Sequence, residues 1–195
     1  MTKKEEIILS TLDLASHYGL KSLSMSQIAE SVGIKKPSLY NHFDSKESLI
    51  KEMYNYIREK SKENLSNSSI NDEEYMKNKS AYEILSGYVQ NYKNLVTNEK
   101  MFNFYKVIYS ERTTNKEACE IIVEETNKMI EATKMLFKYL KESKKLDIDN
   151  IDISSISFAM TIHSLIDYEL DQKMTGQKSD KDLIDNYIKW FCKEK

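Results

Sequence analysis

The amino-acid sequence predicts an all-α protein, and three observations support this prediction. The chain has 195 residues but only four glycines and one proline, so few residues interrupt a helix. Apolar residues recur at spacings of three and four along most of the chain, which is typical of amphipathic helices. No alternating run of β-branched residues is long enough to predict a sheet.

Nine helices are expected, separated by short polar segments. The first, over residues 3–18, carries Ile8, Leu12 and Ala15 on one side and ends before Gly19. The next two are short, and the other six follow with polar connections such as residues 66–72 between them. The last eight ranges are 25–31, 36–42, 46–65, 73–96, 99–110, 115–143, 151–173 and 180–194.

Residues 24–48 form the most specific segment of the chain. Ser24 and Gln27 have the spacing of a capping box, which predicts a helix start. Gly33 suits a turn that needs a left-handed residue, and Pro37 suits the first turn of the next helix. The segment therefore predicts a helix-turn-helix, a motif that binds DNA. The alternative is that these helices are ordinary amphipathic parts of an all-α core.

The residue types in this segment are more specific than the spacing of its capping and turn residues. Its motifs are Tyr18-Gly19, Ile28-Ala29, Val32-Gly33-Ile34, Ser38-Leu39-Tyr40, His42-Phe43 and Ser45-Lys46-Glu47-Ser48-Leu49. Over residues 5–55 the chain resembles the N-terminal domain of the TetR family of bacterial transcriptional regulators. The resemblance implies a helix-turn-helix DNA-binding domain over 1–48, a helix over 46–65 that links the domains, and an effector-binding and dimerisation domain over 49–195.

The predicted DNA contacts divide into phosphate contacts and base contacts. The resemblance implies that Tyr40, His42 and Lys46 contact phosphates, and their donor groups agree with that role. Ser24 or Ser26 can donate to a phosphate at the start of the first helix of the pair. The base-reading candidates are Lys35, Lys36, Pro37, Ser38 and Asn41.

Two features of this helix pair depart from common patterns. Lys35 stands where the family more often has a serine or threonine cap. The pair also contains no arginine, since the chain has only Arg58 and Arg112. The bidentate contact of arginine with guanine is therefore absent from this segment, and we expect an operator rich in A·T pairs.

The last two expected helices are apolar on two sides, which suggests a second partner surface. In the TetR family these helices pair with their copies in a four-helix dimer interface. The alternative is burial within one subunit. The predicted interface residues are Ile156, Met160, Ile184, Tyr187, Ile188 and Phe191.

Residues 75–109 contain eight of the twenty aromatic residues. Tyrosines have apolar faces and polar tips, which suits a pocket for an aromatic or amphipathic molecule. In the family the middle helices enclose the effector, and Gly87 would allow either a close backbone approach or a kink near it. The alternative is a tyrosine-rich core. The predicted effector contacts are Tyr88, Tyr92, Phe102, Tyr105, Met129 and His163.

Charge and motifs exclude several other classes of protein. The net charge is −2, with +1 over residues 1–61 and −3 over the rest, so the chain is not a strongly basic nucleic-acid binder. It shows no signal peptide, no membrane span and no CxxC pair, so we expect a cytoplasmic protein. His17, His42 and His163 fall in different regions, and no catalytic motif is present. We therefore expect no enzyme activity, no cofactor and no metal.

The resemblance to the TetR family implies a repressor that binds double-stranded DNA as a homodimer. Its operator would be an inverted repeat, and a small-molecule effector would release it. Helix 46–65 would transmit the effector signal. The alternative is a DNA-bound structural or division factor of the same fold, with a protein partner and no small-molecule effector.

Overall fold

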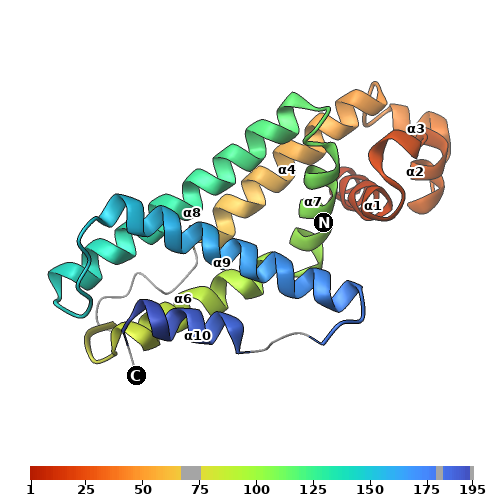
Figure 1. Ribbon diagram of the computed structural model, residues 1–195. Helices are drawn as coiled ribbons and strands as arrows, with labels where there is room; N and C mark the ends of the chain where they lie inside the picture. The colour runs from red at the N-terminus through yellow and green to blue at the C-terminus, as the bar shows by residue number, and fades with distance from the viewer. Residues whose placement is uncertain (67–75, 179–181, 194–195) are drawn as a thin grey trace. The chain divides into compact units, whose positions relative to one another are not determined.

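The computed structural model confirms the all-α prediction. It describes residues 1–66, 76–178 and 182–193. This part of the chain contains nine α-helices, one short 3₁₀ helix and no strand (Figure 1). The helices are α1 (Lys3–Tyr18), η1 (Leu20–Ser22), α2 (Met25–Ser31), α3 (Lys36–Tyr40), α4 (Lys46–Ser66), α6 (Ala81–Val96), α7 (Glu99–Glu111), α8 (Lys116–Glu142), α9 (Ile151–Met174) and α10 (Leu183–Phe191).

Local capping signals explain where the first helix begins and ends. Thr2 N donates to Glu5 Oε2 at 2.7 Å, and Glu5 N donates to Thr2 Oγ1 at 3.2 Å. This capping box satisfies two amides that have no partner within the helix. Gly19, with a φ of +78°, ends the helix. The predicted limits of α1 and of α2 are therefore confirmed at both ends.

Three helices have limits that differ from the prediction by more than one residue: α3, α6 and α10, which spans Leu183–Phe191 rather than 180–194. Helix α3 ends at Tyr40 rather than at residue 42, because the next turn tightens: His42 N donates to Leu39 O, three residues back, and the Phe43 ring is buried in the core. Helix α6 begins at Ala81 rather than at residue 73, because Ser80 and Glu83 form a capping box. Residues 67–75, which include most of the predicted 66–72 linker and the predicted start of that helix, lie outside the described residues.

The chain divides into two compact units. Unit 1 consists of Met1–Ser68 and Leu95–Ile122, and unit 2 consists of Ser69–Asn94 and Val123–Lys195. Helices α1 to α4 and α7 therefore belong to unit 1, α9 and α10 belong to unit 2, and α8 begins in one and continues into the other. The predicted boundary between a DNA-binding domain (1–48) and an effector-binding and dimerisation domain (49–195) was a division by function, and it stays a prediction.

Helix α1 organises unit 1, because it packs on α2, α4 and α7 (Figure 1). Its Ile7 is fully buried, as are Ile28 of α2 and Leu49 of α4. Helix α7 contributes Phe104 and other apolar side chains to the same core. Asn103 Nδ2 of α7 also donates to Asp13 Oδ1 of α1 at 3.1 Å. The helix pair α2–α3 is thus part of a core that includes α7, which lies far from it in sequence.

Aromatic rings form part of the core of unit 2. Phe137 of α8 and Phe158 of α9 are fully buried, and their ring centroids lie 5.4 Å apart in an edge-to-face arrangement. Phe191 of α10 lies 4.9 Å from Phe158 and 5.4 Å from Phe137. Edge-to-face pairs stabilise a core beyond the apolar area that they bury. No helix of the described residues has both the length and the hydrophobicity that crossing a membrane requires.

Replacing Gly87 by alanine is expected to raise the free energy of unfolding by about 1 kcal/mol, because alanine is the better helix former. Gly87 lies within α6, and an added Cβ would meet no described atom within 4 Å, so its expected role near an effector stays a prediction. Urea denaturation tests this prediction. Gly33→Ala is the control: Gly33 has a φ of +67°, so this change should lower stability. A less stable Gly87→Ala protein would contradict the prediction.

Candidate nucleic-acid interface

Local capping and a glycine turn build the helix pair α2–α3. Ser24 N donates to Gln27 Oε1 at 2.9 Å, and Gln27 N donates to Ser24 Oγ at 3.3 Å, which confirms the predicted capping box. At the other end of α2, Gly33 adopts its left-handed conformation and Ile34 N donates to Ala29 O at 3.0 Å. These contacts produce the helix-turn-helix that the sequence predicted.

Helix α3 is held by its apolar side. Leu39 is fully buried and Phe43 nearly so. Pro37 lies in the first turn, where its missing N–H costs little. Lys35 occupies the cap position without a side-chain capping bond, as expected. A helix of five residues has little stability of its own, so its position depends on the residues around it.

All ten predicted DNA-contacting residues lie in unit 1, between the start of α2 and the start of α4. Nine of them are exposed and Lys46 is partly exposed. The structure therefore brings them to the surface of one short segment, where a macromolecule can reach them. The exposed nine are Ser24, Ser26, Lys35, Lys36, Pro37, Ser38, Tyr40, Asn41 and His42.

Lys46 stands at the N-terminus of α4, where backbone amides and the helix dipole favour an anion. Its Nζ lies 3.4 Å from the carbonyl oxygen of Lys21, in η1. Lys21 Nζ in turn lies 3.4 Å from Thr114 Oγ1, in the turn before α8. Lys21 was not among the predicted contacts, because it is far from Lys46 in the sequence and only the fold brings the two residues together. Lys21 is exposed and adds a cation to this surface.

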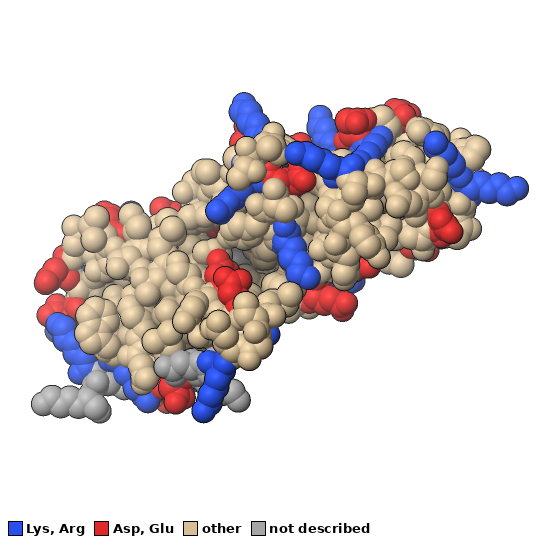
Figure 2. Space-filling model, turned by 45° about the vertical axis from the view of Figure 1, so that its right-hand side comes forward, with Lys and Arg blue, Asp and Glu red and all other residues tan. Residues whose placement is uncertain are grey.

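The charge on this surface is mixed. Figure 2 shows basic side chains projecting at the right of the view, where unit 1 carries α2 and α3, with acidic side chains among them. Hydrogen bonds from its own backbone amide and from the Ser45 hydroxyl hold the pKa of Glu47 below its ordinary value. A carboxylate therefore stays charged beside Lys46. Attraction for an anionic partner must come from individual lysines rather than from net charge.

Four of the six predicted effector contacts lie in unit 2. Tyr92 Oη of α6 and His163 Nδ1 of α9 are 2.9 Å apart and share a hydrogen bond. Tyr88 Oη lies 3.1 Å from the buried hydroxyl of Thr133, which donates to the carbonyl of Met129 at 2.9 Å. The structure thus joins Tyr92 to His163, and Tyr88 to the turn of α8 that begins at Met129. The other two predicted contacts, Phe102 and Tyr105, belong to unit 1.

Sequence reasoning missed an ion-pair network in unit 2. Glu169 Oε2 lies 2.5 Å from Lys93 Nζ, and its Oε1 lies 2.9 Å from Lys173 Nζ. Burial alone would raise the pKa of Glu169, but the two ammonium groups lower it overall. Burial also raises the pKa of Tyr88. The i,i+4 spacing of Glu169 and Lys173 could have indicated their pair, but the contact with Lys93 on α6 has no local signal.

The predicted dimer residues differ in exposure. On α9, Ile156 and Met160 are 44% and 43% exposed. On α10, Ile184, Tyr187 and Phe191 are partly exposed. Ile188 is only 2% exposed, so its prediction as an interface residue was wrong: it turns toward the core of unit 2. Trp190, 72% exposed and next to the Tyr187 ring, was missed, because the sequence cannot show which side of a doubly apolar helix faces inward.

Comparisons of the sequence with known proteins agree with this geometry. Residues 7–53 match the family model of bacterial regulatory proteins of the tetR family. The chain is also similar to IcaR of Staphylococcus aureus (strain Newman), the negative transcriptional regulator of the biofilm operon icaADBC. The two are 29% identical over 179 residues, which cover 84% of this chain and 96% of IcaR.

Solved structures show the same fold. The structure of AibR in complex with isovaleryl coenzyme A and operator DNA has a TM-score of 0.69 at 19% identity and covers 100% of both chains. A transcriptional regulator from Saccharomonospora viridis in complex with choline has a TM-score of 0.68 at 17% identity, covering 97% of this chain and 95% of that one. The chain therefore has the fold of these regulators, and its residues 7–53 form the N-terminal domain of the tetR family of bacterial regulatory proteins.

Proposed function

We propose that the protein is a repressor that binds an inverted-repeat operator as a homodimer in the cytoplasm. The observation that carries this proposal is the exposed polar surface of α2, α3 and the start of α4, held on a buried apolar face. A dimer would place two such α3 helices in successive major grooves, about 34 Å apart or a multiple of that. The similarity to IcaR, a negative regulator, supports repression.

Selection of double-stranded DNA from a random library by the full-length protein tests this proposal. We expect an enriched inverted repeat with half-sites rich in A·T, because the helix pair reads through lysine, serine, asparagine and a proline ring. Recovery of G·C-rich half-sites would contradict the base preference alone. Failure to enrich any sequence would contradict operator binding.

The individual side chains are expected to divide into positioning and reading residues. Tyr40→Ala and Lys46→Ala should weaken binding to all sequences alike, and Lys46→Ala should lower the slope of log affinity against log salt by about 1. Asn41→Ala should instead relax preference at one base pair, at a cost of about 1–3 kcal/mol for the preferred base. Titrations of operator and scrambled DNA at several salt concentrations measure both effects.

Lys51→Ala, at an exposed lysine further along α4, is the control for loss of charge. It should change neither the base preference nor, beyond a small amount, the salt slope. Equal loss of discrimination in all three variants would show that the division is wrong.

We also propose that unit 2 responds to a small aromatic or amphipathic effector through Tyr88, Tyr92, Met129 and His163. The hydrogen bonds of the two tyrosines and the histidine place polar groups among apolar helices, an arrangement suited to an amphipathic molecule. The AibR and Saccharomonospora viridis structures, which contain isovaleryl coenzyme A and choline, support a small-molecule effector for this fold.

An effector would favour one spacing of the two α3 helices over another and so shift the population away from the DNA-binding state. Thermal-shift screening of aromatic and amphipathic compounds, followed by operator titration with each hit, tests this part. A compound that stabilises the protein and releases the operator is expected. A stabilising compound that leaves the distance between the two α3 helices unchanged, measured by spin labels, would contradict the mechanism.

A further inference from the structure

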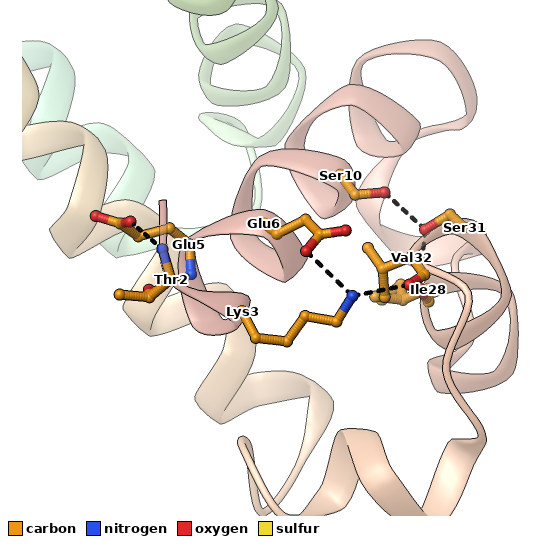
Figure 3. Close-up of polar contacts among 8 residues, drawn as sticks. All are labelled: Thr2, Lys3, Glu5, Glu6, Ser10, Ile28, Ser31 and Val32. Atoms are coloured by element: carbon orange, nitrogen blue, oxygen red, sulfur yellow. Dashed lines mark hydrogen bonds and ion pairs between the residues drawn. The ribbon is translucent and has the colours of Figure 1, made fainter.

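A polar stripe runs along one side of α1, toward the end of α2. Lys3, Glu6 and Ser10 are spaced three and four residues apart, so they lie on one face of the helix. Figure 3 shows Lys3 and Ser10 turned toward Val32 and Ser31 at the C-terminal end of α2. The apolar residues of α1, such as Ile7 and Leu12, are buried instead. The stripe is therefore a contact separate from the core.

Two hydrogen bonds join the stripe to α2. Lys3 Nζ donates to the carbonyl of Val32 at 3.0 Å and lies 3.1 Å from Glu6 Oε2, so the carboxylate orients the ammonium (Figure 3). The hydroxyl oxygens of Ser10 and Ser31 are 2.6 Å apart. The Ser31 hydroxyl also donates to Ile28 O at 2.8 Å. The last turn of α2 is thus fixed to α1 at two points.

The Lys3 contact lies at the turn that sets the direction of the chain between α2 and α3. Val32 is the C-cap of α2, and its carbonyl comes directly before the Gly33 turn that leads into α3. Carbonyls at a helix C-terminus carry partial negative charge, which a cation stabilises. Beyond the turn, α3 begins without a side-chain cap and is short. The position of the turn therefore has a direct effect on the position of α3.

Apolar packing and hydrogen bonds constrain this position differently. Burial of Leu39 and Phe43 holds α3 against the core, but apolar contact is largely non-directional. A charge-assisted hydrogen bond has a defined length and direction. Contacts to base edges require accurate placement of α3, whereas long side chains can reach phosphates from a range of positions.

We propose that Lys3 is a positioning residue for DNA recognition, which sets the orientation of α3 through the carbonyl of Val32. This inference rests on the proposed operator binding. Lys3→Met keeps the aliphatic stem and removes the donor. Lys3→Met should lower the ratio of operator affinity to scrambled-DNA affinity about fivefold, which is the effect of one hydrogen bond. Lys3→Arg, which keeps a charged donor, should leave this ratio unchanged.

The matched control is Lys4→Met, which removes the same charge from the same turn of α1. Lys4 pairs with Glu52 of α4 at 3.2 Å and lies over the Phe43 ring, so it contacts α4 and the turn before it rather than the end of α2. Lys4→Met should leave the ratio unchanged. An equal fall of the ratio in both variants, or an equal loss for operator and scrambled DNA in Lys3→Met alone, would overturn the proposal.

Hydrogen exchange gives a second measurement that needs no DNA. The amides of residues 33–43 should exchange faster in Lys3→Met than in the wild-type protein and in Lys4→Met, while the amides of α7 should not change. If Lys3→Met does not fold, Ser10→Ala can be measured in its place. It removes the other contact and should also speed the exchange of residues 33–43. Unchanged exchange in these variants would overturn the proposal even where operator selection succeeds. If selection fails but exchange responds, the proposed function is wrong and the positioning of α3 stands.

Discussion

Replacing Met160 by glutamate is expected to convert the proposed homodimer into monomers and to lower operator affinity at least about a hundredfold. Met160 and Ile156 are exposed at a spacing of four residues on α9, and Ile153, 62% exposed, continues the same line. A carboxylate on this line would be buried without a partner in a dimer. Burial of an unpaired charge costs several kcal/mol, more than one apolar contact can offset.

The loss of DNA binding would follow from the loss of the dimer. In the proposed dimer, two linked α3 helices would bind two half-sites together, so separation would remove the gain from bivalent binding. Sedimentation equilibrium measures the oligomeric state, and titration of the full inverted repeat and of one half-site measures both affinities. We expect the half-site affinity to stay unchanged.

Met135→Glu is the matched control for this substitution. Met135 lies on α8, also in unit 2, and is 66% exposed, but it is not part of the predicted interface. This variant should remain dimeric and bind the operator normally. A dimeric Met160→Glu protein with normal operator affinity would show that α9 is not the interface.

Replacing Phe137 by alanine is expected to lower the free energy of unfolding by about 3–5 kcal/mol, the usual cost of removing a buried aromatic ring. Phe137 is fully buried and contacts Phe158 and Phe191 from two neighbouring helices. The change would leave a cavity where α8, α9 and α10 meet. Because α9 and α10 also carry the predicted dimer surface, the substitution should weaken dimerisation as well.

Urea denaturation followed by circular dichroism measures this loss. Met135→Ala provides the comparison on the same helix, because its side chain is mostly exposed and its loss should change stability by less than about 0.5 kcal/mol. A cost below about 1 kcal/mol for Phe137→Ala would mean that the aromatic cluster is not a main source of the stability of unit 2.

Features with a local cause could be predicted from the sequence. Local signals predicted the limits of α2 and the start of α3 without any knowledge of tertiary packing. These signals are the Ser24–Gln27 capping box, the Gly33 turn and Pro37. The buried side of α3 followed from the spacing of Leu39 and Phe43. Local rules were equally available for α6, where the Ser80–Glu83 capping box was overlooked.

Features that depend on distant residues could not be predicted. The bond from Lys3 to Val32 joins residues 29 positions apart, and the bond from Asn103 to Asp13 joins residues 90 apart. Nothing in the sequence near Ile188 or Trp190 shows which of them faces the core of unit 2. Periodicity identifies an apolar helix, but a helix with two apolar sides leaves its orientation to tertiary packing.

The place of α7 in the core of unit 1 decides whether the DNA-binding part can be transplanted. Met101, Phe104, Val107 and Ile108 cover apolar side chains of the first helices. A chimaera built from residues 1–66 alone would expose that apolar surface on its new host and would be prone to aggregate. A graft that exchanges operator preference between two regulators therefore has to carry residues 95–122 as well, or match the surface of α7 in the recipient.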